Sequence, residues 1–135
     1  MIRIMSDQDI EGLVNAVLSQ CRQADWEQIW NELEVQLVTF SELGLKVDST
    51  DMDIWNCCQE HGIVLLTGNR NAETPDSLET TIREHNLSNS WPVLTFGDLR
   101  RLKFDRDYLE LAAERLMEKL IDIEALRGTG RLYIP

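Results

Sequence analysis

The chain has 135 residues, of which 43% are hydrophobic and 27% are charged, and its formal net charge at pH 7 is −11. This composition is typical of a globular protein and argues against bulk disorder. No apolar run approaches the roughly 20 residues of a membrane helix, and the amino terminus lacks the apolar core of a signal peptide, so we expect a cytoplasmic protein with no membrane segment. The acidic charge excludes a passive nucleic-acid coat, because such a surface repels phosphates.

The chain contains three cysteines, Cys21, Cys57 and Cys58. An odd number cannot pair completely within one chain, and two adjacent cysteines suit neither a zinc site nor a structural disulfide. We therefore expect three reduced thiols that pack as small hydrophobic side chains.

The first third of the chain predicts two strands and two helices. Residues 2–5 form a short apolar run that ends at the polar Ser6. Apolar residues then recur at helical spacing from Ile10 to Leu18, and a second helix is expected over Asp25–Leu33. Val35–Phe40 is rich in residues that favour strands and predicts the second strand.

The middle of the chain predicts a helix, a buried strand and a second helix. Thr50 is a favourable N-cap with carboxylates after it, and Gly62 stands where a glycine commonly ends a helix. The apolar run Ile63–Leu66 is typical of a strand buried on both faces, and residues 67–71 are expected to form the turn after it. A helix that includes Leu78, Ile82 and His85 follows.

The last third predicts a fourth strand, Val93–Phe96, and a long helix over about Arg106–Leu126. Arg131–Ile134 is expected to be an edge strand or a docked tail. Alternating strands and helices predict an α/β fold of three layers, α/β/α, with a parallel sheet of four to five strands. We expect a single domain over residues 1–135, with the last helix and tail at about 106–135.

Acidic and amide side chains gather where several of these strands end. The carboxyl ends of parallel strands share one edge of the sheet, which is where sites form in such folds. A helix that leads back into a strand begins at this same edge. The residues that these positions select are Asp7, Asp9, Asp51, Asp53, Asn69, Asn71 and Asp98.

Two interpretations of these residues are open. Carboxylates that meet at one point repel each other unless a cation neutralises them, and Mg²⁺ or Mn²⁺ prefers such oxygen ligands. A metal held there could orient water for attack on a phosphodiester. Alternatively, Asp7, Asp9, Asp51 and Asp53 are helix caps, and Asn69 and Asn71 are ordinary turn residues.

The order of these motifs resembles the PIN-like domains, particularly a small bacterial branch. Residues 4–10 resemble the first acidic motif of that family, with Asp7 in the metal-binding place. Residues 50–54 resemble the second motif, and residues 65–71 resemble the third. The resemblance covers roughly residues 1–98. It implies a Mg²⁺-dependent ribonuclease, commonly a toxin that is paired with an antitoxin protein.

The resemblance implies roles for individual residues. Asp7 and Asp53 would be the principal metal ligands, and Asn69 and Asn71 would be neutral ligands or substrate contacts. The other carboxylates expected near the metal are Asp9, Asp51 and Asp98. Family members usually have aspartates where this chain has Asn69 and Asn71.

That departure leaves a second hypothesis, a catalytically impaired PIN-like module for interaction or oligomerisation. The expected partners are RNA, a cognate antitoxin-like protein or a second copy of the chain. The acidic pair at Asp7 and Asp9 also fits a haloacid-dehalogenase-type phosphohydrolase, although the lysine and acidic pair that such enzymes need do not follow.

Arg100, Arg101 and Lys103 form the one compact basic patch in the sequence. Such a patch can contact a phosphate backbone or an acidic neighbour, or it can simply be a solvated helix end.

Overall fold

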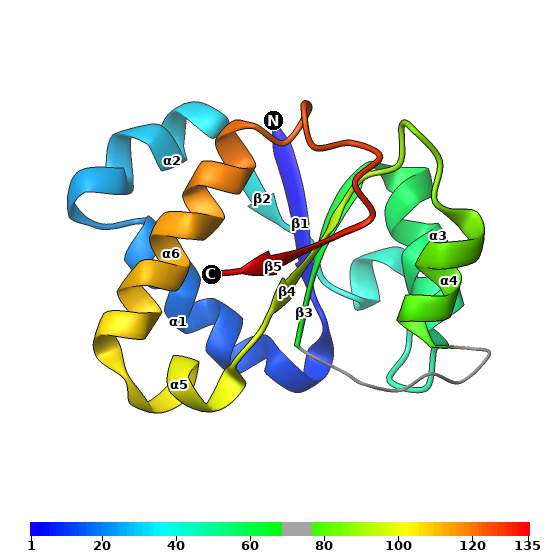
Figure 1. The fold of residues 1–135 in the computed structure, drawn as a ribbon, viewed down its shortest axis with the longest axis horizontal. Helices are drawn as coiled ribbons and strands as arrows, with labels where there is room; N and C mark the ends of the chain where they lie inside the picture. Colours follow the sequence, from blue (N-terminus) through cyan, green and yellow to red (C-terminus); the bar gives the residue numbers. More distant parts are fainter. Residues whose placement is uncertain (69–76) are drawn as a thin grey trace.

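The computed structural model describes residues 1–68 and 77–135, and it has three layers, with a sheet between two sets of helices (Figure 1). The strands are β1 (Ile2–Ser6), β2 (Val35–Leu37), β3 (Ile63–Gly68), β4 (Val93–Phe96) and β5 (Arg131–Ile134). The α-helices are α1 (Glu11–Cys21), α2 (Glu27–Leu33), α3 (Asp51–His61), α4 (Leu78–His85), α5 (Leu99–Phe104) and α6 (Arg106–Ile121). Short 3₁₀ turns are η1 (Gln8–Ile10), η2 (Ala24–Trp26) and η3 (Ser41–Leu43). Among the described residues, no helix is long and apolar enough to cross a membrane.

The five strands form one sheet in the order β2-β1-β3-β4-β5, and every neighbouring pair is parallel. The predicted α/β class and parallel sheet are therefore confirmed. The strand order reverses at β1, because the chain goes from β1 outward to β2 and then returns past β1 to β3. In doubly wound folds this switch point, between β1 and β3, is where ligands bind.

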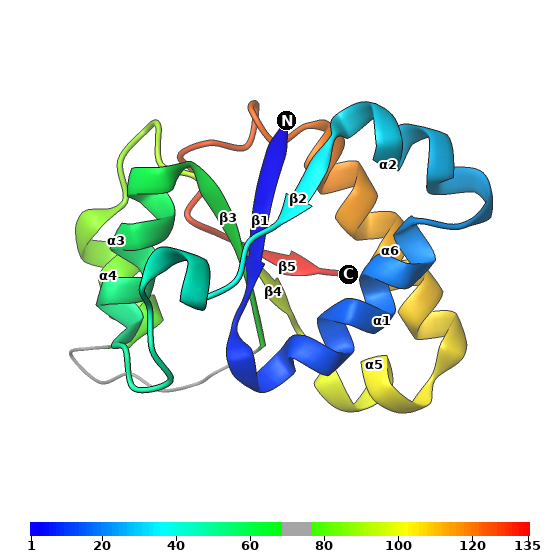
Figure 2. The same cartoon turned by 180° about the vertical axis from the view of Figure 1, so that it is seen from behind.

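Each face of the sheet has its own set of helices. We call them the α1/α6 face, which α1, α2, α5 and α6 cover, and the α3/α4 face, which α3 and α4 cover (Figures 1 and 2). Successive residues of a strand point to opposite faces, so Ile4 packs on the α1/α6 face and Met5 on the α3/α4 face. All six residues of β3 are buried, which is why its sequence is continuously apolar rather than alternating.

Each face also holds one buried cysteine. Cys21 lies in the core of the α1/α6 face, where its Sγ is 3.7 Å from the Ala113 carbonyl oxygen of α6. Cys58 lies in the core of the α3/α4 face. Burial raises the pKa of both thiols to about 12. These two cysteines are free and buried, as expected, whereas Cys57 is only partly buried.

The connection from β4 to β5 differs in handedness from the other crossover connections of the sheet. The step from β4 to β5 runs in the same direction across the sheet as the step from β3 to β4. The helix of the earlier step, α4, covers the α3/α4 face, but α5 and α6 cover the opposite face (Figures 1 and 2). The first three crossovers have the usual right hand, and this last one is therefore left-handed, which is rare in parallel sheets.

Small residues of α6, Ala112 and Ala113, are buried where α6 packs beside α1.

Several element boundaries differ from those expected. β2 ends at Leu37 rather than Phe40, because the chain then turns to bury Phe40 in the α3/α4 core. Thr67 and Gly68, expected in a turn, extend β3 and pair with Thr95 and Phe96 of β4.

The region after β4 also differs. A separate helix, α5, precedes the expected long helix, because Asp98 and Asp105 each accept a backbone N–H and start a new helix. The long helix α6 ends at Ile121 rather than Leu126. Arg131–Ile134 is a true edge strand, β5, and pairs with β4.

Gly128, between α6 and β5, provides a test of this arrangement. Its φ is +89°, and a methyl group added there would lie 2.5 Å from the backbone oxygen of Ser88. Gly128→Ala should lower the free energy of unfolding by at least about 2 kcal/mol, because it combines backbone strain with a clash against main chain. Urea denaturation measures this effect. Gly97→Ala is the control, since an added methyl group meets nothing within 4 Å there, and an equal loss in both variants would contradict the explanation.

Candidate functional site at the carboxyl edge

Asp7 directly follows β1 at the switch point between β1 and β3. Its backbone N–H donates to the Leu66 carbonyl of β3 over 2.9 Å, so the sheet fixes its position. Its own carbonyl accepts from the N–H of Ile10, the last residue of the first helical turn, η1. The side chain is half-buried and does not cap η1. Asp9, two residues further on, is exposed within η1.

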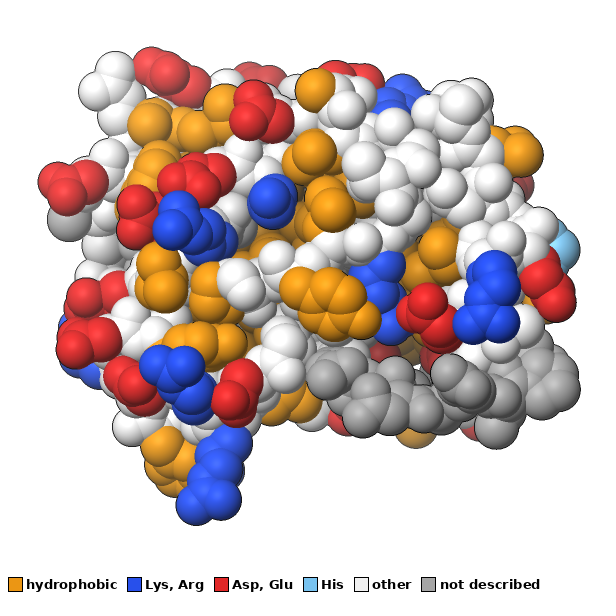
Figure 3. Space-filling model, viewed as in Figure 1, with side chains coloured by type: hydrophobic (Ala, Val, Ile, Leu, Met, Phe, Trp, Pro, Cys, Tyr) orange, Lys and Arg blue, Asp and Glu red, His pale blue; other side chains and the backbone are white. Residues whose placement is uncertain are grey.

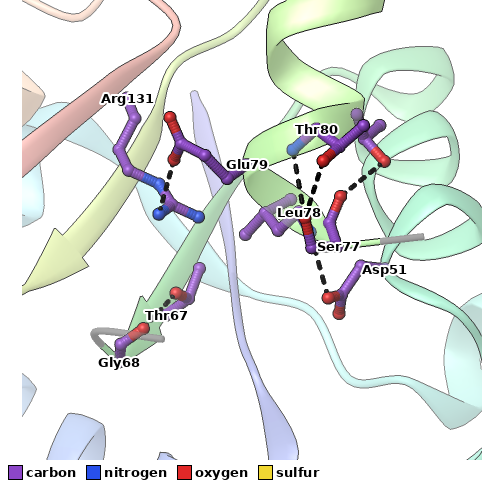
Figure 4. Close-up of polar contacts among 9 residues, drawn as sticks. Asp51, Thr67, Gly68, Ser77, Leu78, Glu79, Thr80 and Arg131 are labelled. Atoms are coloured by element: carbon purple, nitrogen blue, oxygen red, sulfur yellow. Dashed lines mark hydrogen bonds and ion pairs between the residues drawn. The ribbon is translucent and has the colours of Figure 1, made fainter. Parts of the chain in front are cut away.

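Asp51 and Asp53 both lie in the first turn of α3, but their side chains have different surroundings. The Asp51 carboxylate is half-buried and accepts a hydrogen bond from the Leu78 N–H, the first backbone group of α4, over 3.1 Å (Figure 4). Asp51 thereby joins the beginnings of two helices, where a negative charge is favourable. Asp53 is exposed, and its backbone N–H donates to the Thr50 side chain that caps α3.

Asp98 is the N-cap of α5. Its carboxylate accepts the Arg101 N–H over 3.0 Å, and its side chain is exposed. Of the aspartates that the sequence suggested as caps, Asp51 binds a helix N-terminus, that of α4 rather than that of its own helix. The N-cap of α3 is Thr50, as expected.

The described residues do not form a complete metal site. Within residues 1–68 and 77–135, no group of three or more His, Cys, Asp or Glu side chains gathers closely enough to hold an ion. Asn69 and Asn71, together with Glu73 and Asp76, which could supply further oxygen ligands, lie outside the described residues. The predicted metal site therefore stays a prediction, with Asp7 as its best-placed described member.

The structure also reveals a polar group that the sequence did not single out. Arg131 of β5 is in register with Val93 and therefore points to the α3/α4 face, where it pairs with Glu79 of α4 at 3.0 Å (Figure 4). Only 8% of the Arg131 side chain is exposed, against 43% for Glu79. Among the described residues, neither the Arg131 Nε nor the fully buried Thr95 hydroxyl has a hydrogen-bond partner.

Register explains this group. Thr67, Thr95 and Tyr133 form one row across three strands, and Arg131 lies two rows earlier, so its side chain points to the same face. Thr67 and Thr95 lie two positions after Leu65 and Val93, which both pack on the α3/α4 face, so the threonines point to that face as well. The signal in the sequence was a single arginine at the start of an otherwise largely apolar strand. It identified no partner, because Glu79 lies in a helix far away along the chain.

The cap made by Asp51 can be measured. Asp51→Ala should lower the free energy of unfolding by about 1 kcal/mol, because the Leu78 N–H loses its acceptor. Asp53→Ala is the matched control, since it removes a carboxylate from the same turn of α3 without touching α4. Chemical denaturation of both variants distinguishes the cap from a general effect of charge at this helix end. Equal losses would contradict the bridging role of Asp51.

The pair between Arg131 and Glu79 can be tested in the same way. Glu79→Ala should destabilise the protein by about 1–3 kcal/mol, because it leaves a buried guanidinium without its counter-charge, an effect that partial exposure of Glu79 reduces. Glu118→Ala removes an exposed partner of Arg115 at a similar distance, 3.0 Å, and should cost less than about 1 kcal/mol. Thermal or urea unfolding compares the two. A larger effect at Glu118 would show that burial does not control this pair.

Comparisons with known proteins identify no family for the chain. No model of a protein family, no curated protein and no solved structure matches it. The PIN-like resemblance therefore rests on the order and placement of its motifs.

Proposed function

We propose that the protein is a PIN-like, metal-dependent ribonuclease that works at the carboxyl edge of its sheet, with Asp7 as the central residue. In this proposal it cleaves phosphodiester bonds of RNA in the cytoplasm. An antitoxin-like protein or a second copy of the chain would be its protein partner.

The position of Asp7 is the observation that carries the proposal. Asp7 is half-buried at the switch point of a doubly wound parallel sheet, and hydrogen bonds of its backbone to β3 and η1 hold it there. A catalytic group needs such a rigid mount, because small displacements from the productive geometry lower the rate severely.

A divalent ion suits the chemistry of this carboxylate. Mg²⁺ and Mn²⁺ are hard cations that take oxygen ligands, and a bound ion would activate water and stabilise charge at the phosphate. Asp7 would bind the ion, and exposed Asp9 lies close enough in sequence to assist it. Asp51 and Asp98 are less suited, because their carboxylates already accept backbone N–H groups.

Asp7→Asn tests the proposal, because it removes the charge and keeps the shape of the side chain. We expect RNA cleavage with Mg²⁺ or Mn²⁺ to fall by at least about 100-fold, and calorimetry to show weaker Mn²⁺ binding. Asp122→Asn is the control, since Asp122 is an exposed carboxylate at the end of α6. Cleavage that survives Asp7→Asn would refute this site.

The caps favour one alternative, a PIN-like module for interaction or oligomerisation without nuclease activity. Two of the carboxylates expected at the metal, Asp51 and Asp98, serve the fold instead. This alternative predicts no Mn²⁺ binding by the wild type. It also predicts a solution mass above the 15.6 kDa of one chain, which light scattering measures.

A further inference from the structure

The exposed face of α5 combines positive charge with an aromatic ring. Lys103 and Phe104 lie three and four residues after Arg100, and therefore on the same side of the helix as Arg100. All three are exposed, and 74% of Phe104 is accessible to solvent. The Lys103 ammonium lies 5.4 Å from the centre of the Phe104 ring. We call these three residues the α5 face.

The charge of the α5 face is not compensated locally. Helix α5 has three basic residues and no acidic ones, in a chain whose net charge is −11. The acids that flank α5 in the sequence are engaged elsewhere, because Asp98 caps α5, while Asp105 caps α6 and pairs with Arg101 at 3.5 Å. In the part of the chain that the structure describes, Arg100 and Lys103 form no ion pair. Figure 3 shows Lys and Arg side chains at the lower left of the molecule, over α5, with Asp or Glu side chains beside some of them.

The α5 helix begins beside the turn that contains Asp7. Leu99, its first residue, and Ile10, the last residue of η1, meet over the end of β3. A methyl group on Gly68 would lie 2.8 Å from Leu99 Cδ1 and 3.3 Å from Ile10 Cγ2. The positive helix and the candidate site are therefore neighbours on the same edge of the sheet.

We propose that the α5 face binds single-stranded RNA, with Arg100 and Lys103 on phosphates and Phe104 stacked on a base. This inference rests on the proposed function and supplies its docking surface. Sites for single strands combine basic groups that follow the backbone with aromatic rings that stack on bases. An acidic protein segment would satisfy the two charges but would leave the exposed ring of Phe104 without a role.

The negative charge of the whole chain shapes how this surface works. At physiological salt the Debye length is about 8 Å, so distant carboxylates are largely screened while contacts at α5 persist. The proposal therefore predicts that RNA binds to a local patch of small area. The affinity should depend only weakly on salt concentration, because few phosphates are contacted.

The experiment measures binding of a fluorescent single-stranded oligouridine of about 12 nucleotides by anisotropy in EDTA, so that no cleavage occurs. Lys103→Glu/Phe104→Ala should weaken binding by about tenfold or more. Arg100→Glu alone should weaken it by severalfold and reduce the salt slope by about 0.7. All these side chains are exposed, and circular dichroism verifies that each variant is folded.

The chain offers a closely matched control in Lys46→Glu/Val47→Ala. Lys46 and Val47 are also an adjacent lysine and apolar residue, both exposed, and the substitution changes the net charge equally. This variant should bind like the wild type. Asp7→Asn should also bind, which separates failure of docking from failure of catalysis.

Three outcomes would overturn the proposal. The wild type could fail to bind the oligouridine, or the Lys46 variant could lose as much affinity as the Lys103 variant. Polyglutamate could also compete as well as unlabelled oligouridine, which would assign the α5 face to an acidic protein partner.

Discussion

Burial of β3 on all sides is the constraint from which the remaining architecture follows. The strand has a neighbour at each edge and helices over each face, and none of its six residues reaches solvent. Its backbone groups can be satisfied only by β1 and β4, so the pairing register is fixed. Parallel pairing then requires every connection to cross a face and return, which brings the carboxyl ends of all strands to one edge. The placement of Asp7 and of α5 is a result of this geometry.

The elements that the sequence predicts well are those with a strong local period. The apolar run Ile63–Leu66 and the capped helix at Thr50 are defined by neighbours along the chain, and the structure confirms both. Helix α5 escaped prediction because six residues are too few to establish a helical period, although the cap at Asp98 marks its start. The pair between Arg131 and Glu79 depends on which edge β5 joins and on which face α6 covers. Neither choice is local, so no pattern in the sequence could reveal it.

The acidic edge illustrates how one electrostatic preference serves two purposes. Helices that begin at the carboxyl edge present the positive ends of their dipoles there, and carboxylates stabilise those ends. Asp51 and Asp98 show this use directly through hydrogen bonds to backbone N–H groups. A cation site draws on the same residue types, which explains why spacing alone could not separate ligands from caps. Asp7 differs from both, since its backbone is hydrogen-bonded to the sheet and its side chain does not cap η1.

The two buried cysteines make the faces of the sheet separately observable. Cys21 belongs to one core and Cys58 to the other, and both are shielded from water in the native state. Because burial holds each thiol neutral, reaction with an alkylating reagent requires the surrounding helices to open. The labelling rates at Cys21 and Cys58 thus report separately how fast each layer of helices opens. Equal rates would reveal a molecule that opens only as a whole, and unequal rates would reveal which layer detaches first from the sheet.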